Sequence, residues 1–525
     1  MCARQAFVST IVALVIALLA VPVEARTFRV ALERDVASMD PHVRAEGHSR
    51  GFHHNIYEPL VRYSAALEFE PALATRWQLI NPVTWRFELR RDVRFHNGNK
   101  FDADDVVFSF ARVRGEGSDF AAFVESIQQI HKVDSHTVEL ITRSPDPTLL
   151  SGLARWYIMD REWARANGAE LPAPPDGPRR NHALLHANGT GPFVLDERRP
   201  GVRTILEPNP NWWDQPRHNL NRVIITPIES NASRTKALLS GKLSLTLPLA
   251  LPDIARIDEA DGLRVLQGPD VRTIFLGMDQ FRDHLLYSDV EEANPFKDLR
   301  VRRALYRAID IEAIQREVMG GASTPTGLLV GPGVTGFNEQ MNRRPPYSPE
   351  AARALLAEAG YPEGFSVTLD CPSDRYVKDS EICQVVAEML AKVGIRVTPL
   401  AQSTTKFFKK LMNGDVSFYL LGWTPGDLDA GSVIRDLLVP PHEGGLDWNA
   451  GRFGDPRISR LSHRIAAEVN PTKRQAMIDQ CFRIMQEQVG YIPLHQQALA
   501  WGVREGVDLA QRPDNALHYW TVKME

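Results

Sequence analysis

Two short segments of this chain combine charged and aromatic residues in a pattern suited to ligand binding. The first, CPSDRYVKD, contributes Arg375 and Tyr376, and the second, GWTPGDLDAGS, contributes Trp423, Asp427 and Asp429. A guanidinium that faces a carboxylate across a cleft, with an indole between them, suits a zwitterion bearing a carboxylate and an ammonium group. These five side chains are therefore candidate ligand-binding residues, although each alone could equally belong to a surface ion pair or a packed aromatic cluster.

The segments around these residues alternate between strand and helix patterns. SVTL (366–369), IRVTPL (395–400) and VSFYLL (416–421) are strand-like, and a helical pattern lies between each strand and the next. This alternation predicts parallel strands joined by right-handed crossovers. Ligands of such sheets bind beyond the carboxyl ends of the strands. Both candidate segments follow a strand directly, so we expect them to meet at one edge of the sheet.

The first 25 residues are typical of a secretory signal peptide. Arg4 precedes an apolar run at 6–21, and the small-residue terminus VEA follows at 23–25. Ser9 and Thr10 interrupt the run, which falls short of the roughly 20 residues that a membrane span needs. We expect cleavage after Ala25 and a soluble exported protein.

Three cysteines remain after that cleavage: Cys371, Cys383 and Cys481. Disulfides persist in an export compartment, and an odd count leaves at least one thiol free or paired between chains. Cys371 and Cys383 lie twelve apart, at an expected strand end and helix start, so they are candidates for a local disulfide. Cys481 shares a helical face with apolar residues, which indicates a buried core thiol.

The composition is that of an ordinary globular protein of two to four domains. The 525 residues are 43% hydrophobic and 24% charged. Against 65 acidic residues the 61 basic ones leave a net charge of −4, which argues against nucleic-acid binding. A segment with many arginines at 296–321 instead predicts two helices, the first burying the face from Val301 to Ile309 and the second capped by Asp310. The arginines of the first helix are expected to project mostly to water or to partners such as Asp298; they are Arg300, Arg302, Arg303 and Arg307.

Motifs for catalysis or cofactor binding are not evident. GPGVTG at 331–336 has the dinucleotide-loop spacing, but it contains a proline and no helix follows it. The acidic residues at 102–105 are explained by a helix start with Asp102 as the cap. His53, His54 and Glu58 give only a weak metal signal. We therefore expect no enzyme, no cofactor and no metal.

Seven segments, in order, resemble the peptide-binding class of extracytoplasmic solute-binding proteins. This is family 5, the peptide/nickel class: receptors of ABC importers for dipeptides, oligopeptides, nickel chelates and related solutes. The segments are YEPLV (57–61), RFHNGNKFDADDVVFSF (94–110), GTGPF (189–193), NPNWW (209–213), LRVRRALYRAIDIEAI (299–314), YSPEAARALLAEAGYPEGF (347–365) and YIPLH (491–495).

The resemblance implies an α/β, two-lobed Venus-flytrap fold of the periplasmic-binding-protein type, type II-like, with an additional subdomain. Residues 1–25 are then the signal peptide. Lobe I comprises 26–60, 190–275 and 490–525, with an inserted subdomain II at 61–189 and lobe III at 276–489. Chain crossings are expected near 190, 275 and 490. A hinge is expected at Gly189, Thr190 and Gly191, where glycines permit unusual backbone angles.

The resemblance also implies roles for site residues. In dipeptide-binding relatives, an aspartate shortly after the tryptophan of a GW pair neutralises the peptide amino terminus, and an arginine in the preceding strand-to-helix loop takes the carboxylate. Trp423 and Arg375 occupy matching places. The family's aspartate falls at Gly426 here, with Asp427 one residue later, and Arg375 lacks the usual proline and asparagine neighbours. The pocket is therefore expected to be reshaped, and its ligand need not be a dipeptide.

The leading hypothesis is a monomeric periplasmic receptor that captures short peptides by lobe closure and delivers them to an inner-membrane ABC permease. The alternative is the same role for a nickel chelate, an opine or another amino-acid-derived solute, with His442 or His495 touching a metal complex. An exported hydrolase would need a nucleophile or metal constellation that the sequence lacks. A chaperone for unfolded segments would bind long chains rather than one small solute.

Overall fold

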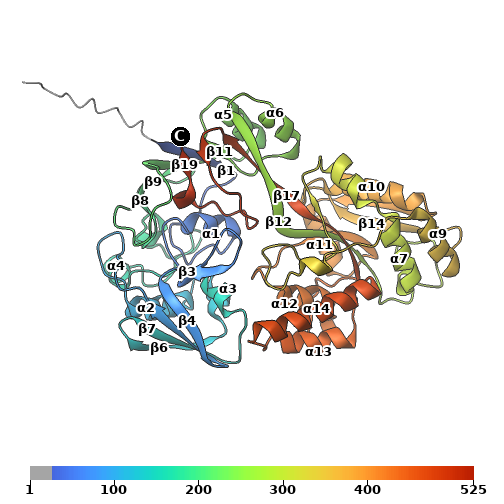
Figure 1. The fold of residues 1–525 in the computed structure, drawn as a ribbon, viewed down its shortest axis with the longest axis horizontal. Coiled ribbons are helices and arrows are strands. Elements are labelled where there is room, and N and C mark those ends of the chain that lie inside the picture. The colour runs from blue at the N-terminus through green and yellow to red at the C-terminus, as the bar shows by residue number, and fades with distance from the viewer. Residues whose placement is uncertain (1–25) are drawn as a thin grey trace, which may run out of the picture.

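The structure, a computed structural model, describes residues 26–525, and the predicted signal peptide lies outside this range. Two lobes lie side by side and are connected by two long strands, β12 (Leu263–Met278) and β17 (Tyr491–Arg504) (Figure 1). The first lobe holds β1 to β11, and the second holds β14 to β16. The predicted two-lobed α/β architecture is confirmed.

One sheet of 11 strands runs through both lobes. Its order is β15-β14-β16-β12-β17-β11-β1-β10-β9-β8, and β13 pairs with β17 off this path. The remaining strands are β1 (Thr27–Leu32), β8 (Phe193–Arg199), β9 (Arg203–Pro208), β10 (Arg222–Pro227), β11 (Leu245–Thr246), β13 (Thr324–Pro325), β14 (Ser366–Pro372), β15 (Arg396–Gln402) and β16 (Phe418–Trp423).

The two long strands divide their pairing between the lobes. The first half of β12, from Leu263, pairs with the end of β17, which also contacts β11. The second half, from Thr273, pairs with the start of β17 and with β16. The antiparallel register shifts between Pro269 and Thr273, where the pair passes from one lobe to the other. A bulge at this point locally bends and twists the pair.

The residues expected to form the hinge, Gly189, Thr190 and Gly191, do not lie where the chain passes between the lobes. Gly189–Gly191 is buried in the first lobe, and the Gly191 amide donates to the carbonyl oxygen of Ile56. A β-carbon on either glycine would collide with that carbonyl, and neither glycine has a left-handed backbone conformation. These glycines permit close packing of two backbone segments, whereas the passage between the lobes is made by β12 and β17.

The first lobe carries a second, antiparallel sheet of order β4-β5-β7-β6. Asp102 caps α2 as predicted, and Asp105 completes a capping box with it. The elements at 61–166 are β2 (Val61–Tyr63), β3 (Phe69–Pro71), β4 (Ala74–Asn81), β5 (Thr84–Leu89), α2 (Ala103–Val113), β6 (Ile127–Asp134), β7 (Thr137–Thr142), α3 (Leu149–Leu153) and α4 (Arg161–Ala166). The rest of the lobe adds α1 (Gly47–His53), α5 (Asn231–Leu239), α6 (Ile254–Asp258), β18 (Val507–Asp508) and β19 (Lys523–Met524).

A buried carboxylate joins three of the segments singled out in the sequence. Glu58 accepts hydrogen bonds from Thr190 Oγ1 at 2.8 Å, Trp213 Nε1 at 2.7 Å and Trp212 Nε1 at 3.2 Å. Its side chain is thus fully engaged in holding YEPLV, GTGPF and NPNWW together, since a buried carboxylate requires such donors. This role explains Glu58 without a metal ion.

The second lobe alternates strand and helix as predicted. Strand β14 is parallel to both β15 and β16. The helices are α7 (Leu299–Ala308), α8 (Ile311–Ala313), α9 (Pro349–Glu358), α10 (Asp379–Ala391), α11 (Thr404–Met412), α12 (Ala430–Val433), α13 (Pro456–Ile465) and α14 (Pro471–Gln488). Cys481 on α14 is a buried free thiol, and burial raises its pKa to about 12.

The arginine-rich helix α7 differs from expectation at one position. Val301 and Ile309 are buried as predicted, and Arg300 pairs with Asp298 in the exposed helix start. Arg302, expected to face water, is buried and donates to the carbonyl oxygens of Phe296 and Gln488. A guanidinium with five donors can satisfy backbone carbonyls at a loop junction, which apolar periodicity alone does not reveal.

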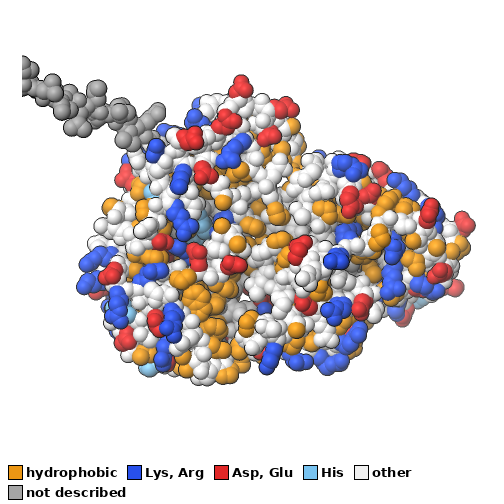
Figure 2. All heavy atoms as spheres, in the orientation of Figure 1, with side chains coloured by type: hydrophobic (Ala, Val, Ile, Leu, Met, Phe, Trp, Pro, Cys, Tyr) orange, Lys and Arg blue, Asp and Glu red, His pale blue; other side chains and the backbone are white. Residues whose placement is uncertain are grey.

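Basic and acidic side chains are interspersed over the face shown in Figure 2, in line with the near balance of charges in the sequence. Among the helices of residues 26–525, none combines the length and the apolar character that a membrane crossing requires.

Candidate functional site

A cavity of about 910 Å³ lies between the two lobes. The first lobe contributes Arg50, His54 and Arg155 to the cavity wall. Strand β12, which connects the lobes, contributes Arg272, and the second lobe contributes Arg375 and Thr424. A volume near 900 Å³ falls in the upper part of the range of small-molecule sites. Because both lobes line the cavity, a bound molecule would contact both of them.

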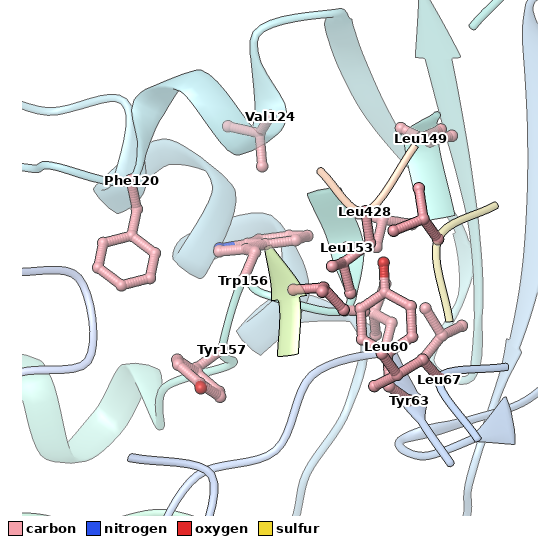
Figure 3. Close-up of a cluster of buried hydrophobic side chains, with 14 of the residues drawn as sticks. Leu60, Tyr63, Leu67, Phe120, Val124, Leu149, Leu153, Trp156, Tyr157 and Leu428 are labelled. Carbon is pink, nitrogen blue, oxygen red and sulfur yellow. The ribbon is translucent and has the colours of Figure 1, made fainter. Parts of the chain in front are cut away.

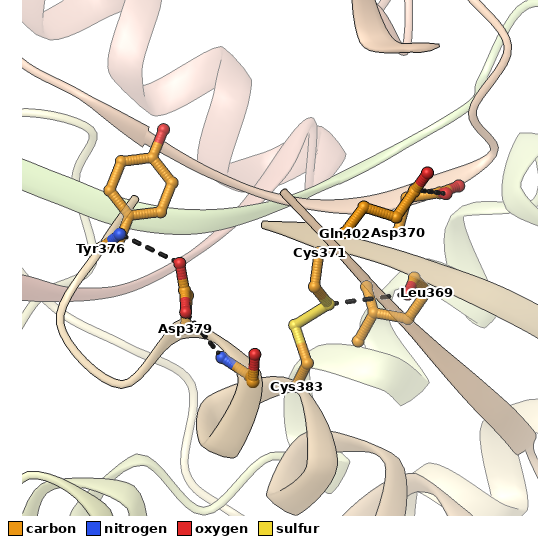
Figure 4. Close-up of a disulfide and its surroundings, with 8 residues drawn as sticks. Leu369, Asp370, Cys371, Tyr376, Asp379, Cys383 and Gln402 are labelled. Carbon is orange, nitrogen blue, oxygen red and sulfur yellow. Dashed lines mark hydrogen bonds between the residues drawn. A yellow bond between two sulfur atoms is a disulfide. The ribbon is translucent and has the colours of Figure 1, made fainter. Parts of the chain in front are cut away.

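The loop that carries Arg375 is held rigidly. The carboxylate of Asp379 accepts hydrogen bonds from the backbone amides of Arg375 and Tyr376, both at 3.0 Å. Figure 4 shows the bond from Tyr376. Asp374 on the other side accepts from the amide and hydroxyl of Thr404, each at 2.6 Å. These contacts fix the backbone at Arg375 while its exposed side chain extends to the cavity.

A disulfide closes the base of the same loop. Cys371 at the end of β14 is bonded to Cys383 on α10, and both are buried (Figure 4). It ties the strand before the loop to the helix after it, so the segment that carries Arg375 and Tyr376 is restricted at both ends.

Removing this bond is expected to weaken both the fold and the site. In a Cys371→Ala/Cys383→Ala variant, the free energy of unfolding should fall by about 2–4 kcal/mol, because the unfolded chain regains conformational freedom. Ligand affinity should fall with it, because the loop is less ordered. Denaturant unfolding with and without reductant tests this: reductant should reproduce the loss in the parent protein and change nothing in the double variant. A parent protein indifferent to reductant would contradict the prediction.

Tyr376 organises two guanidinium groups instead of presenting its hydroxyl to a ligand. Its hydroxyl donates to the carbonyl oxygen of Gly422 at 3.1 Å. The guanidinium carbons of Arg272 and Arg375 lie 5.9 and 5.7 Å from the centre of its ring, within cation–π range. Two cations thus converge on one aromatic ring, which places a double positive charge on the second-lobe side of the cavity.

Trp423 is not among the residues that line the interlobe cavity. Its ring packs against Trp448 with centres 5.2 Å apart, and its buried indole nitrogen has no hydrogen-bond partner among residues 26–525. Thr424, Pro425 and Gly426, the next residues along the chain, line the cavity instead. The predicted stacking of an indole on the ligand is therefore not what the structure shows.

The two aspartates of the second segment do not oppose Arg375. Asp427 lines a second cavity, also of about 910 Å³, between the first lobe and the helices α12 to α14. Its Oδ1 accepts from Ser432 Oγ at 2.7 Å and from the amide of Asp429 at 3.1 Å. Asp429 caps α12 and forms a bidentate pair with the buried Arg474, with both contacts at 2.7 Å. The expected pairing of Arg375 with an aspartate across one cleft is thus corrected.

The electrostatics of these aspartates agree with that assignment. Burial and the neighbouring charge of Asp429 raise the pKa of Asp427, although Ser432 and Arg155 act in the opposite direction. A raised carboxyl pKa disfavours the anionic form that would bind an ammonium group. Asp429 is already neutralised by Arg474. Neither carboxylate is therefore free to bind a ligand ammonium in the interlobe cavity.

The segment between the two cavities bridges the lobes. Leu428, with a left-handed φ of 54°, lies among Leu149, Leu153 and Leu67 of the first lobe (Figure 3). Beside it, Ser151 Oγ of the first lobe donates to the carbonyl oxygen of Asp427. The second lobe thus places an apolar side chain in the core of the first. The two cavities adjoin here, since Arg50, Arg155 and Gly426 line both.

Sequence reasoning missed the first-lobe residues of the cavity. Arg50 lies on α1 and Arg155 just after α3, far from either predicted segment. Four acidic residues also line the cavity: Glu33, Asp270, Asp374 and Asp514. One available signal was the GHSRGFHHN stretch, where Arg50 precedes His53 and His54 on a short helix.

His442 and His495, the histidines considered for a metal complex, do not line the interlobe cavity. His495 is buried on β17, and burial lowers its pKa to about 3. His442 is exposed on a short turn after α12. His54 does line the cavity, but burial likewise lowers its pKa to about 3. In the part of the chain described, residues 26–525, no three His, Cys, Asp or Glu side chains form a group that could hold a metal ion.

Comparison with known protein families assigns the chain to one of them. The model described as bacterial extracellular solute-binding proteins, family 5 Middle, matches residues 68–444. The chain belongs to this family. The resemblance predicted from seven sequence segments is thereby confirmed, and the interlobe cavity becomes the candidate site of a solute-binding protein.

Several relatives match this solute-binding protein along most of its length. Heme-binding protein A of Haemophilus influenzae is 26% identical over 467 residues, which cover 84% of this chain and 81% of the relative. The dipeptide-binding protein of Escherichia coli is 28% identical over 414 residues and covers 73% of each chain. The structure of HbpA2 from Haemophilus parasuis has a TM-score of 0.82 at 22% identity, covering 95% of this chain and 100% of the other. The unliganded open form of the murein tripeptide-binding protein MppA has a TM-score of 0.80 at 20% identity, covering 95% and 98%.

Proposed function

We propose that this solute-binding protein is the periplasmic receptor of an ABC importer and captures short peptides in the interlobe cavity. It acts as a monomer without catalysing a reaction, and its closed form delivers the peptide to an inner-membrane permease. Closure follows from contact with both lobes, because a ligand shifts the equilibrium toward the arrangement in which it makes more contacts.

The observation that carries the proposal is the cavity itself, lined by both lobes and by charges of both signs. Arg375 and Arg272 supply donors for a peptide carboxylate, since guanidinium groups bind carboxylates by charge-assisted hydrogen bonds. Glu33, an exposed carboxylate on the wall, can face an ammonium group. The names of relatives support the same class, among them the Escherichia coli dipeptide-binding protein and a Pseudoalteromonas protein solved with Met-Leu, whose TM-score is 0.67.

The test is to identify what the protein carries. We expect that residues 26–525, purified from the native periplasm and denatured, release short peptides at near one-to-one occupancy, as measured by mass spectrometry. A single opine or other non-peptide amino-acid derivative, or a metal chelate, would overturn the peptide assignment and favour the alternative ligand class. Structures of that class exist within the fold, with agropinic acid (TM-score 0.65) and with Ni(L-His) (TM-score 0.68).

Arg375→Gln is expected to weaken binding of the released peptides by roughly 10- to 150-fold, because a hydrogen bond to a charged group contributes about 1.5–3 kcal/mol. Isothermal titration calorimetry measures the loss. The matched control is Arg353→Gln in the same lobe, since Arg353 is exposed on α9 and donates to the Lys392 carbonyl oxygen. Equal affinities of the two variants would remove Arg375 from the site.

A further inference from the structure

Five arginines line the interlobe cavity without forming a salt bridge to any carboxylate of residues 26–525. Arg34 is exposed next to the exposed Glu33, and the other four form two pairs. Arg50 and Arg155 come from the first lobe, while Arg272 and Arg375 lie on the opposite side. Arginines without carboxylate partners are common on protein surfaces. A convergent set on the wall of one cavity is unusual, because like charges repel unless an anion lies between them.

Arg155 is the most deeply buried of these arginines. Its side chain is buried, with a residue exposure of 7%, and its one side-chain hydrogen bond within the described chain is from Nη1 to Ser151 Oγ at 2.9 Å. That hydroxyl cannot act as a counter-ion, and it already donates to the Asp427 carbonyl oxygen. The charge of Arg155 does act on the Asp427 carboxyl, but the two form no salt bridge, and burial raises the pKa of that carboxyl, so it offsets the cation only in part. Because burying an incompletely balanced cation is costly, an anion supplied by a ligand would stabilise Arg155.

Arg50 lies beside Arg155 and is in a similar position. In the described chain its guanidinium has no hydrogen-bond acceptor, and it lies 5.5 Å from the ring centre of Phe123. Burial, followed by the charge of Arg155, lowers its pKa to about 10, at which it still carries a full positive charge at neutral pH. The first lobe therefore presents two neighbouring cations to the cavity.

Arg272 and Arg375 form the second pair, and both lie near the Tyr376 ring. Arg272 donates from Nε to the hydroxyl of Thr424 at 3.0 Å, and no side-chain hydrogen bond involves the Arg375 guanidinium within the described residues. Both guanidinium groups thus keep most of their donors free for a ligand. The cavity has a pair of cations on each of its two sides.

The acidic residues of the wall do not balance these four charges. Asp514 is neutralised by Arg512 in a bidentate pair. Asp374 keeps its negative charge, but its Oδ1 accepts from the Thr404 amide and hydroxyl and not from an arginine. Asp270 is buried, which raises its pKa, and Glu33 is exposed at the rim. A peptide with neutral side chains brings one carboxylate and one ammonium group, so it leaves at least one pair of arginines without an anion.

We propose that the preferred ligands carry anionic groups at two separated positions, as short peptides with an acidic side chain do. One carboxylate lies against Arg272 and Arg375, and the other lies against Arg50 and Arg155. This inference rests on the proposed function, which it narrows from short peptides in general to acidic ones.

Calorimetric titration of ligand-free protein with matched peptides tests it. The probes are Ala-Glu, Ala-Gln and Ala-Lys, with the tripeptides Ala-Glu-Ala, Ala-Gln-Ala and Ala-Lys-Ala. We expect the glutamate peptides to bind at least tenfold more tightly than the glutamine peptides at one or both lengths, and the lysine peptides to bind most weakly. Equal affinities for glutamate and glutamine peptides would overturn the inference and leave the proposed function intact. Binding of none of the six would count against the proposed function itself.

Variants then locate the effect. Arg50→Gln and Arg155→Gln should each reduce the ratio of glutamate to glutamine affinity severalfold, with little change in affinity for the glutamine peptide. Arg303→Gln, an exposed position on α7, should keep the full ratio. Thermal unfolding separates binding from folding, because removal of an unpaired buried cation should leave the melting temperature of Arg155→Gln unchanged or higher. A preserved ratio in both cavity variants would overturn the assignment of the second anion site.

Discussion

Replacement of Asp40 by alanine is expected to lower the free energy of unfolding by about 3–5 kcal/mol, because it leaves a buried arginine without its counter-ion. Asp40 and Arg112 have fully buried side chains, and Arg112 Nη1 lies 2.9 Å from Asp40 Oδ1. Arg112 also bonds to the His42 ring and the Ala169 carbonyl oxygen, so neither solvent nor another carboxylate can replace Asp40.

The same pair predicts how stability depends on pH. Burial alone would raise the pKa of Asp40, but the charge and hydrogen bonds of Arg112 outweigh it and hold the pKa below its ordinary value. A carboxyl with a lowered folded-state pKa stabilises the protein above its unfolded pKa of about 4 and loses that contribution as pH falls through the lower folded value.

Urea unfolding at pH 7 and at a series of lower pH values checks both points. The parent protein should lose stability on acidification faster than Asp40→Ala does. Asp176→Ala is the matched control, since Asp176 pairs with Arg44 on the surface of the same lobe and should cost less than about 1 kcal/mol. Similar losses for the two variants would show that the buried pair contributes no more than a surface pair.

Truncation of Leu428 to alanine is expected to weaken the contact between the lobes. The side chain is 6% exposed and comes from the second lobe into the apolar cluster of the first, so its removal leaves a cavity between them. Core Leu→Ala changes cost about 2–5 kcal/mol, and here the loss falls on the contact between lobes, not on either lobe alone. The equilibrium should shift toward more open arrangements.

Small-angle X-ray scattering without ligand should then give a larger radius of gyration for Leu428→Ala than for the parent, and peptide affinity should fall. Leu446→Ala, an exposed leucine of the same lobe, should change neither quantity. An unchanged radius of gyration together with unchanged affinity would mean that the Leu428 contact does not help to set the lobe arrangement.

Local patterns predicted the second lobe well. The alternation of strands and helices at 366–421 fixes a parallel sheet by itself, because each crossover is short and its helix has a clear apolar stripe. The loops of Arg375 and Asp427 accordingly follow neighbouring parallel strands. Cys371 and Cys383 lie at the strand end and helix start expected of them, and the structure joins them.

The candidate site was harder to predict, because its parts come from distant segments. Asp427 and Asp429 follow the right strand, but their direction depends on Ser432 and Arg474, which no local pattern reveals. Arg50, Arg155 and Arg272 belong to three separate elements that only the packing of the lobes brings together. Arg302 shows the same limit, since its burial depends on carbonyl groups at the end of α14.

The position of β17 in the main sheet has a consequence for how the chain acquires its structure as it is synthesised. This strand is almost the last to be made, yet it lies between β12 and β11, which precede it by more than 200 residues. Until residues 491–504 arrive, both of these neighbours present unpaired backbone edges that strands of other chains could join. A chain that ended before Tyr491 would therefore lack the strand that joins the two halves of the main sheet, so both halves would be incomplete. The chain needs protection from aggregation until this last segment is in place.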